Sequence, residues 1–164
     1  MVKKGCAMEG DRVNRVTDHA CFGCGERNPI GLKLAFFREG EVVEASFTPR
    51  PEHEGYIGLV HGGILATLLD EAMSWAVISA TGRLMVTARM AIAFRRPVAV
   101  GQPLRVRGWV EQQERRLVRA RAEVRDALEG HVLAEAEGTF LRVAAEQERA
   151  WRERYVRTAR EAGT

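Results

Sequence analysis

The chain contains few cysteines, and their number is odd. Three cysteines occur among 164 residues, and the first ten residues, MVKKGCAMEG, carry two lysines without the apolar stretch of a signal peptide. An odd number of cysteines without an export signal argues against a disulfide framework. We therefore expect a protein of the reducing cytoplasm.

Aromatic residues and lysines are also few. Aromatics make up 7% of the chain, and 3 of its 25 basic residues are lysines, the other 22 being arginines. The net charge of +3 is not accompanied by a recognisable DNA- or RNA-binding motif. Two acids interrupt the longest apolar run, so no uninterrupted stretch reaches membrane-spanning length. We expect neither nucleic acid nor a membrane as a partner.

The chain does contain two clear hydrophobic periods. Residues 31–47 predict two short strands around a turn, and residues 62–79 are apolar around most of a helix, which is typical of a buried helix. Residues 86–94 and 103–143 then alternate apolar and charged side chains, as antiparallel strands with one wet face do. These patterns predict an α+β domain with one long helix.

The two ends of the chain differ from this central part. Residues 1–20 are polar and without pattern, and we expect an N-terminal arm there. Residues 21–143 form the predicted domain, and residues 144–164 have helical propensity, with Gly163 as a plausible stop. An apolar stripe predicts that this tail packs on the domain; it consists of Trp151, Tyr155 and Ala159.

Two adjacent acids lie in the middle of the apolar helix. Asp70 and Glu71 join Thr67 and Ser74 in a polar stripe spaced i, i+3, i+4, i+7. Such a stripe faces either water or, on a helix wrapped by a sheet, a crevice, and its narrowness favours the crevice. A carboxylate in a crevice has a raised pKa and can serve as a base.

Two glycines open the same helix. Its first N–H groups lack intrahelical partners and carry the positive end of the dipole, and glycine lets a ligand approach them closely. Gly62 and Gly63 could therefore stabilise a carbonyl oxygen, as an oxyanion hole does. Gly62 and Asp70 are about 12 Å apart along a helix, so one carbonyl cannot contact both in one chain. An enzyme of this kind requires a dimer, in which two antiparallel helices form two equivalent sites.

Three motifs together resemble the hotdog-fold acyl-CoA thioesterases. They are HGGILATLLDEA (61–72), FRRPVAVGQPLRVRGWV (94–110) and CFGCGERNPIGLKL (21–34), and the likeness is strongest to the PaaI-like and 4-hydroxybenzoyl-CoA thioesterase-like group. The resemblance implies one long central helix wrapped by a curved antiparallel sheet of five to six strands. It also implies hydrolysis of an acyl-CoA without a cofactor, by a homodimer that pairs further into a homotetramer.

The resemblance assigns roles to the residues of the helix motif. Asp70 falls on the catalytic carboxylate, which acts as a general base on water or as a nucleophile. Gly62, with Gly63 beside it, falls on the backbone donor that polarises the thioester carbonyl, and His61 on the residue that helps to shape the site. Glu71 lies about 100° around the helix from Asp70, so we expect it to contact the substrate without sharing the catalytic role of Asp70.

The sequence departs from the family pattern before the helix. Many members carry Asn or Gln six residues before the motif histidine, where this chain has Gly55. His53 and Glu54 are candidates to replace that side chain. For the phosphates of CoA the candidates are three arginines at or near a strand end, and a solvated edge is the alternative for each one: Arg89, Arg95 and Arg96.

The segment HACFGCG (19–25) is similar to a metal knuckle. Thiolate zinc sites usually need four ligands, and the chain offers His19, Cys21 and Cys24 plus Cys6, with no second CxxC motif. We therefore predict no metal, and expect a glycine-rich turn in which the cysteines are small buried residues.

Three functions fit these motifs. The first is an acyl-CoA thioesterase, the second is a non-catalytic hotdog module that binds acyl-CoA as a sensor, and the third is a hotdog dehydratase. The acid in the helix favours the first, because a sensor does not need a carboxylate beside the thioester. The dehydratase ranks below it, because its acid occurs in a differently spaced motif.

Overall fold

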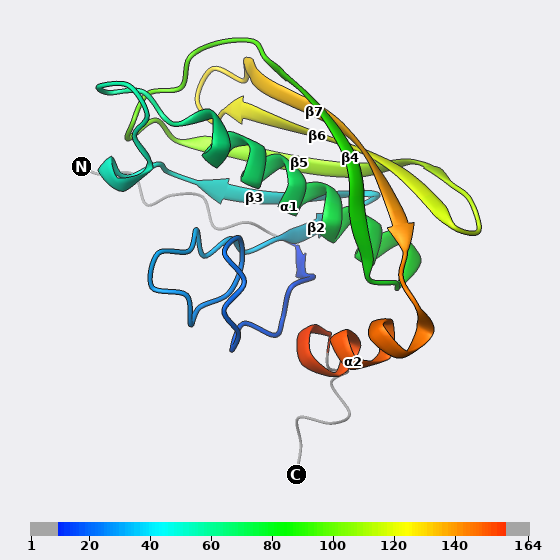
Figure 1. Cartoon of the computed structure of the whole chain (residues 1–164). Coiled ribbons are helices and arrows are strands. Elements are labelled where there is room, and N and C mark those ends of the chain that lie inside the picture. Colours follow the sequence, from blue (N-terminus) through cyan, green and yellow to red (C-terminus); the bar gives the residue numbers. More distant parts are fainter. Residues whose placement is uncertain (1–9, 157–164) are drawn as a thin grey trace.

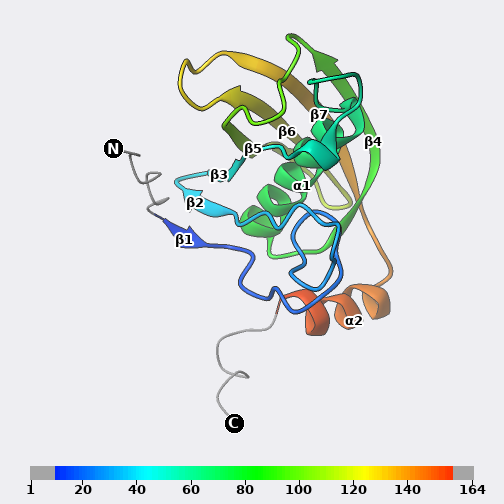
Figure 2. The same ribbon diagram turned by 90° about the vertical axis from the view of Figure 1, so that its left-hand side faces the viewer.

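The computed structural model describes residues 10–156 and shows an antiparallel sheet wrapped around one long helix, α1 (Gly62–Thr81) (Figures 1 and 2). A second helix, α2 (Ala145–Tyr155), follows the last strand. The strands are β1 (Asp11–Arg12), β2 (Phe37–Glu39), β3 (Val42–Phe47), β4 (Met85–Phe94), β5 (Leu104–Gln113), β6 (Leu117–Asp126) and β7 (Val132–Arg142). Their order in the sheet is β1-β2-β3-β5-β6-β7-β4. The predicted hotdog architecture is confirmed, with seven strands where we expected five to six.

The composition of α1 follows from its surroundings. By length and apolar composition alone it would suffice to cross a membrane, with a mean hydropathy of 1.3. In the fold it contacts every strand from β3 to β7, and side chains such as Leu68, Leu69 and Met73 are completely buried. The helix ends at Thr81, and Gly82 caps it in the left-handed conformation, with a φ of 68°.

The outer face of the sheet is polar, as the alternation predicts. On β5 the residues Leu104 and Val106 are buried against the helix, while Arg105 and Arg107 lie on the other face. Arg105 Nη1 lies 2.8 Å and Arg107 Nε 3.1 Å from the carboxylate of Glu44 on β3. Ion pairs across neighbouring strands therefore cover this face.

The strand predicted within residues 31–37 is wrong for all but its last residue. Leu32 and Leu34 are buried, as the alternation indicates, but their N–H groups donate to Phe22 O at 2.8 Å and Gly23 O at 3.0 Å. Lys33 between them has a φ of 57°, which a strand does not allow. This segment instead holds the cysteine-containing residues 19–25, here named the cysteine loop, against the core.

The described part of the expected N-terminal arm belongs to the domain. β1 pairs with β2, and Asn14 is fully buried. Its amide donates to Leu34 O at 2.7 Å and accepts from Phe36 N at 2.9 Å. α2 covers part of the predicted helical tail and packs on the domain through Tyr155, whose ring lies edge-on to His19 at 5.0 Å. The predicted positions of Cys6, Ala159 and Gly163 lie outside the described residues.

Candidate active site

The first turn of α1 leaves one backbone donor free. His61 is the N-cap, and its Nδ1 accepts a hydrogen bond from Gly63 N at 2.9 Å. Ile64 N donates to His61 O at 2.9 Å. Gly62 N–H donates no hydrogen bond within residues 10–156, and the residue is exposed. Of the two predicted glycine donors, Gly62 is therefore available to a ligand at the positive end of the helix, whereas Gly63 is occupied.

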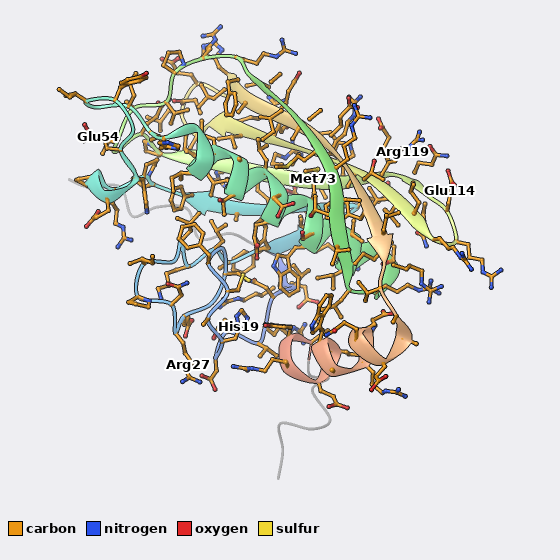
Figure 3. The ribbon with its side chains drawn as sticks, viewed as in Figure 1. His19, Arg27, Glu54, Met73, Glu114 and Arg119 are labelled. Carbon is orange, nitrogen blue, oxygen red and sulfur yellow. The ribbon has the colours of Figure 1, made fainter. Side chains whose placement is uncertain are left out.

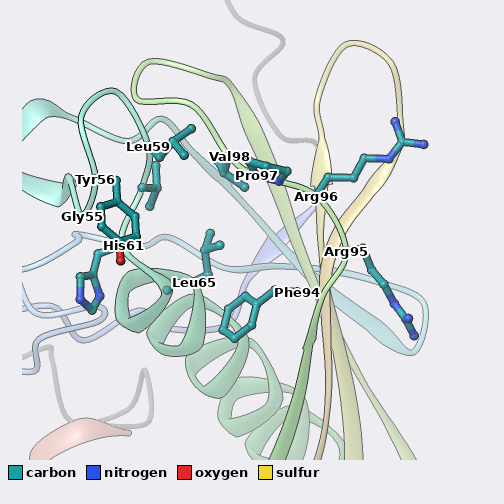
Figure 4. A pocket seen from close by; sticks show the side chains of 12 residues that line it. Gly55, Tyr56, Leu59, His61, Leu65, Phe94, Arg95, Arg96, Pro97 and Val98 are labelled. Atoms are coloured by element: carbon teal, nitrogen blue, oxygen red, sulfur yellow. The ribbon is translucent and has the colours of Figure 1, made fainter.

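A cavity of about 590 Å³ opens beside this turn (Figure 4). Its walls come from the loop before α1, the first turn of the helix, and the end of β4 with the chain that follows. The lining residues are Gly55, Tyr56, Leu59, Val60, His61, Gly62, Leu65, Phe94, Arg95, Arg96, Pro97 and Val98. Most of them are apolar, which suits a ligand with one apolar part that is oriented by a few polar groups.

Asp70 lies two turns further along α1 and does not line this cavity. It is half-buried, and Thr87 Oγ1 on β4 donates a hydrogen bond to its Oδ1 at 2.7 Å. This bond fixes the orientation of the carboxylate. Sequence reasoning missed Thr87, for which the available signal was a hydroxyl within the predicted strand 86–94.

Glu71 contacts the cysteine loop instead of the cavity. Trp75 Nε1 donates to its Oε1 at 3.1 Å, and Cys21 Sγ lies 3.8 Å from the same oxygen. Burial, reinforced by the negative charge of Cys21, raises the pKa of Glu71 to about 7. The two adjacent acids thus face different surroundings, and the structure gives Glu71 no position against a substrate in the Gly62 cavity.

His53 and Glu54 are held by the loop that contains them. His53 is buried, its Nδ1 accepts from Arg50 N at 3.0 Å, and burial together with the charge of Arg50 lowers its pKa. Glu54 Oε1 accepts from Gly58 N at 3.0 Å. Neither side chain lines the cavity, so neither replaces the Asn or Gln of the family pattern there.

Gly55 has a steric reason for lacking a side chain. A Cβ at this position would lie 3.0 Å from the Cα of His61 and 3.3 Å from its Cβ. The loop therefore packs directly against the N-cap of α1, and an Asn or Gln side chain would require the loop to move.

The three arginines differ in their surroundings. Arg96 lines the cavity, and its side chain has no hydrogen-bond or ion-pair partner in the described part of the chain. Arg95 also lines the cavity, but its Nε donates to Glu135 Oε1 at 3.2 Å. Arg89 lies elsewhere, in a surface hollow shared with Arg119 and Glu137. Arg96 is the best placed of the three to meet an anionic part of a ligand.

The chain is similar to known proteins. A model of the thioesterase superfamily matches residues 57–133, which include α1 and β4. THEM4 of Bos taurus, an acyl-coenzyme A thioesterase, is 27% identical over 135 residues, which are 81% of this chain and 55% of that protein. The chain therefore spans about half the length of the curated relatives it matches.

Two solved structures extend the likeness to the fold. An X-ray structure of a thioesterase superfamily protein is 30% identical with a TM-score of 0.64, over 71% of this chain and 91% of that one. A point mutant of the phenylacetic acid degradation protein PaaI from Thermus thermophilus is 26% identical with a TM-score of 0.61, over 68% of this chain and 95% of that one. With its hotdog fold and its HGG-initiated helix, this chain belongs to the thioesterase superfamily.

Proposed function

We propose that the protein hydrolyses acyl-CoA thioesters to a carboxylic acid and free CoA, at a site formed by two copies of the chain. The observation that carries this proposal is the free Gly62 N–H at the positive end of α1, exposed beside an apolar cavity. The superfamily and the kinship with an acyl-CoA thioesterase support the substrate class.

In the proposed reaction the thioester carbonyl oxygen accepts a hydrogen bond from Gly62 N–H. Asp70 takes a proton from water, which attacks the carbonyl carbon, or the carboxylate attacks that carbon itself and the resulting anhydride is then hydrolysed. In either case Gly62 N–H and the helix dipole stabilise the oxyanion of the tetrahedral intermediate. Collapse of the intermediate breaks the C–S bond and releases CoA as its thiolate.

The position of β4 supports a site shared between two copies. β4 pairs with β7 along one edge, and its other edge is unpaired within the described residues. A strand of ten residues with a free edge is a ready template for pairing with another chain. We infer that two copies pair through β4, antiparallel and about a two-fold axis.

This pairing would unite the separated catalytic groups. Thr87, near the start of β4, is bonded to Asp70, and Phe94, at its end, lies beside Gly62. In an antiparallel pair the start of one strand lies opposite the end of the other. Asp70 of one copy would then face the Gly62 cavity of the second copy.

Arg96 would meet the CoA portion of the substrate. Guanidinium groups form paired hydrogen bonds with phosphates, and Arg96 lies on the cavity wall without a competing partner within residues 10–156. The apolar part of the cavity would hold the pantetheine arm or the acyl chain.

Release of free thiol from a panel of acyl-CoAs tests the proposal. We expect turnover by the wild type and a fall of about 100-fold or more in Asp70→Asn, because a positioned base contributes that much to a rate. Asp18→Asn is the matched control, since Asp18 is an exposed carboxylate whose ion pair with Arg27 is long, at 3.7 Å. Turnover that survives in Asp70→Asn would contradict the assignment.

A second candidate function is a module that binds acyl-CoA without hydrolysing it. Gly55 favours it, because this position supplies no polar side chain to hold an attacking water. Measurable acyl-CoA binding by the wild type, without turnover on any substrate of the panel, would select this function over the enzyme.

A further inference from the structure

A second group of reactive side chains lies where the cysteine loop meets α1. The thiols of Cys21 and Cys24 and the carboxylate of Glu71 each place one atom within 4.8 Å of the other two. The loop runs alongside α1 and next to α2, and His19 marks its start in Figure 3. Glu71 comes from a segment 50 residues away from Cys21, so the fold, and not the local sequence, assembles the group.

The spacing of these atoms fits a tetrahedral metal site. With Zn–S distances of about 2.3 Å and Zn–O distances of about 2.0 Å, neighbouring ligand atoms lie roughly 3.5–3.8 Å apart. Cys21 Sγ lies 3.8 Å from Glu71 Oε1 and 3.9 Å from Oε2. Both cysteines are free thiols, not a disulfide.

The loop is shaped closely around the carboxylate. A Cβ on Gly23 would lie 2.5 Å from both Cδ and Oε2 of Glu71, so only a glycine lets the backbone approach this near. A Cβ on Gly25 would lie 2.2 Å from His19 O, so the loop is equally tight at its other end. The backbone of the loop thus packs directly against the Glu71 carboxylate.

The acidic groups of this cluster have no lysine or arginine partner in the described residues. Cys21 Sγ lies 3.8 Å and 3.9 Å from the two carboxylate oxygens of Glu71, whose side chain is half-buried. In the described residues no lysine or arginine forms an ion pair with Glu71, and its side-chain donor besides the thiols is the neutral indole of Trp75. A divalent cation would take the place of the protons on the thiol and the carboxyl group, since these groups bind a metal in their deprotonated forms.

His19, which the sequence offers as a ligand, is engaged elsewhere. Its Nδ1 accepts from Cys21 N at 3.3 Å, and its Nε2 lies 3.0 Å from Val16 O, a carbonyl to which it can only donate. The histidine therefore supports the loop with both ring nitrogens, and Glu71 takes the third position in its place.

We propose that Cys21, Cys24 and Glu71 bind one thiophilic divalent cation, such as zinc, with water in the fourth position. The ion ties the cysteine loop to α1 at the residue next to Asp70. The inference does not depend on thioesterase activity, because an inactive protein with this fold would bind the ion equally well.

Metal titration of the 164-residue chain tests this site. After treatment with reductant and chelator and removal of both, we expect the wild type to bind one Co²⁺ per chain with a thiolate-to-cobalt charge-transfer band that Zn²⁺ abolishes. Zn²⁺ should also raise the Tm of the wild type. We expect Cys21→Ser, Cys24→Ser and Glu71→Gln each to weaken binding by about tenfold or more. The control is Glu26→Gln, an exposed acid just beyond the loop, which should bind as the wild type does.

Three results would overturn the proposal. One is a wild type that binds no stoichiometric ion, and another is a charge-transfer band that persists unchanged in Cys21→Ser and Glu71→Gln. The third is an intact mass showing that the thiols of the purified protein are joined in a disulfide. Should the buried Cys24→Ser fail to fold by circular dichroism, the other two variants still decide the question.

Discussion

The seating of α1 on the sheet can be tested by adding one methyl group. Gly108 lies on β5 beneath the helix, and a Cβ there would lie 2.4 Å from Ala72 O and 3.1 Å from Met73 N. Both are backbone atoms of α1, which cannot turn aside as a side chain does. Because ordinary contacts of a Cβ begin near 3.4 Å, Gly108→Ala forces the helix away from the sheet by about 1 Å.

The cost of that displacement follows from what the helix buries. A gap of about 1 Å removes a quarter to a half of the dispersion energy at each contact, and overpacking of cores typically costs about 1–3 kcal/mol. α1 buries eight side chains against its surroundings, so many contacts loosen at once. We expect Gly108→Ala to lower the free energy of unfolding by about 3 kcal/mol.

Gly138→Ala is the matched control. Gly138 lies on β7 beneath the same helix, but its added Cβ would meet Met73 Cε and Sδ at 3.0 Å and Phe140 Cε2 at 3.1 Å. These are side-chain atoms that need to shift by only a few tenths of an ångström, so we expect a smaller loss, of about 1 kcal/mol. Urea unfolding measures the free energy of unfolding of both variants, provided that its dependence on urea concentration, the m-value, is the same in each. Equal destabilisation by the two substitutions would refute the reasoning, since it depends on the difference between backbone and side-chain neighbours.

Substitutions at three further positions test the active site and the neighbouring Glu71. Thr87→Ala should lower kcat about tenfold or more while Thr87→Ser restores it, because the hydroxyl orients Asp70; equal activity of both variants would exclude this role. Arg96→Ala should raise KM for acyl-CoA but not for the same acyl group on pantetheine, whereas Arg89→Ala should leave both KM values unchanged. An equal rise in KM on both substrates in Arg96→Ala would contradict the phosphate contact. In the presence of a chelator, the free energy of unfolding of Glu71→Gln should rise relative to that of the wild type as the pH goes from 4.5 to 7, by about 3 kcal/mol at most. The reason is that Glu71 keeps its proton in the folded state and releases it in the unfolded chain over this range, so the wild type loses stability. Urea unfolding at several pH values measures the difference, and a difference that does not change with pH would contradict the prediction.

The sequence predicted the fold well where the signal is local. The apolar circumference of residues 62–79 and the alternation after residue 85 identified α1 and the long strands, because each pattern reports how one element is buried. The same logic failed at residues 31–36. Leu32 and Leu34 alternate with exposed or half-buried neighbours as in a strand, yet their N–H groups bond to the cysteine loop. An alternation of apolar and polar residues identifies which side chains are buried, but it does not identify the hydrogen-bond partners of the backbone.

The candidate site was predictable in its motif and not in its details. The motif assigns the backbone donor to Gly62, but the physical reason, which is that His61 Nδ1 accepts from the N–H of Gly63, is visible only in the structure. Thr87 became relevant only through its contact with Asp70, across 17 residues, and the contact of Cys21 with Glu71 spans 50 residues. No local pattern carries contacts of that length.

The two neighbouring acids show how one helix can serve two purposes. A step of about 100° between adjacent residues turns Asp70 toward β4 and Glu71 toward the cysteine loop. The polar stripe therefore follows the seam where the sheet ends and the loop begins, which explains why it is half-buried and narrow. On the β4 side, the strand edge is unpaired within residues 10–156, and there the proposed second copy would bring its Gly62 cavity to Asp70. On the loop side, the chain closes over the carboxylate, which favours the binding of an ion over contact with a substrate.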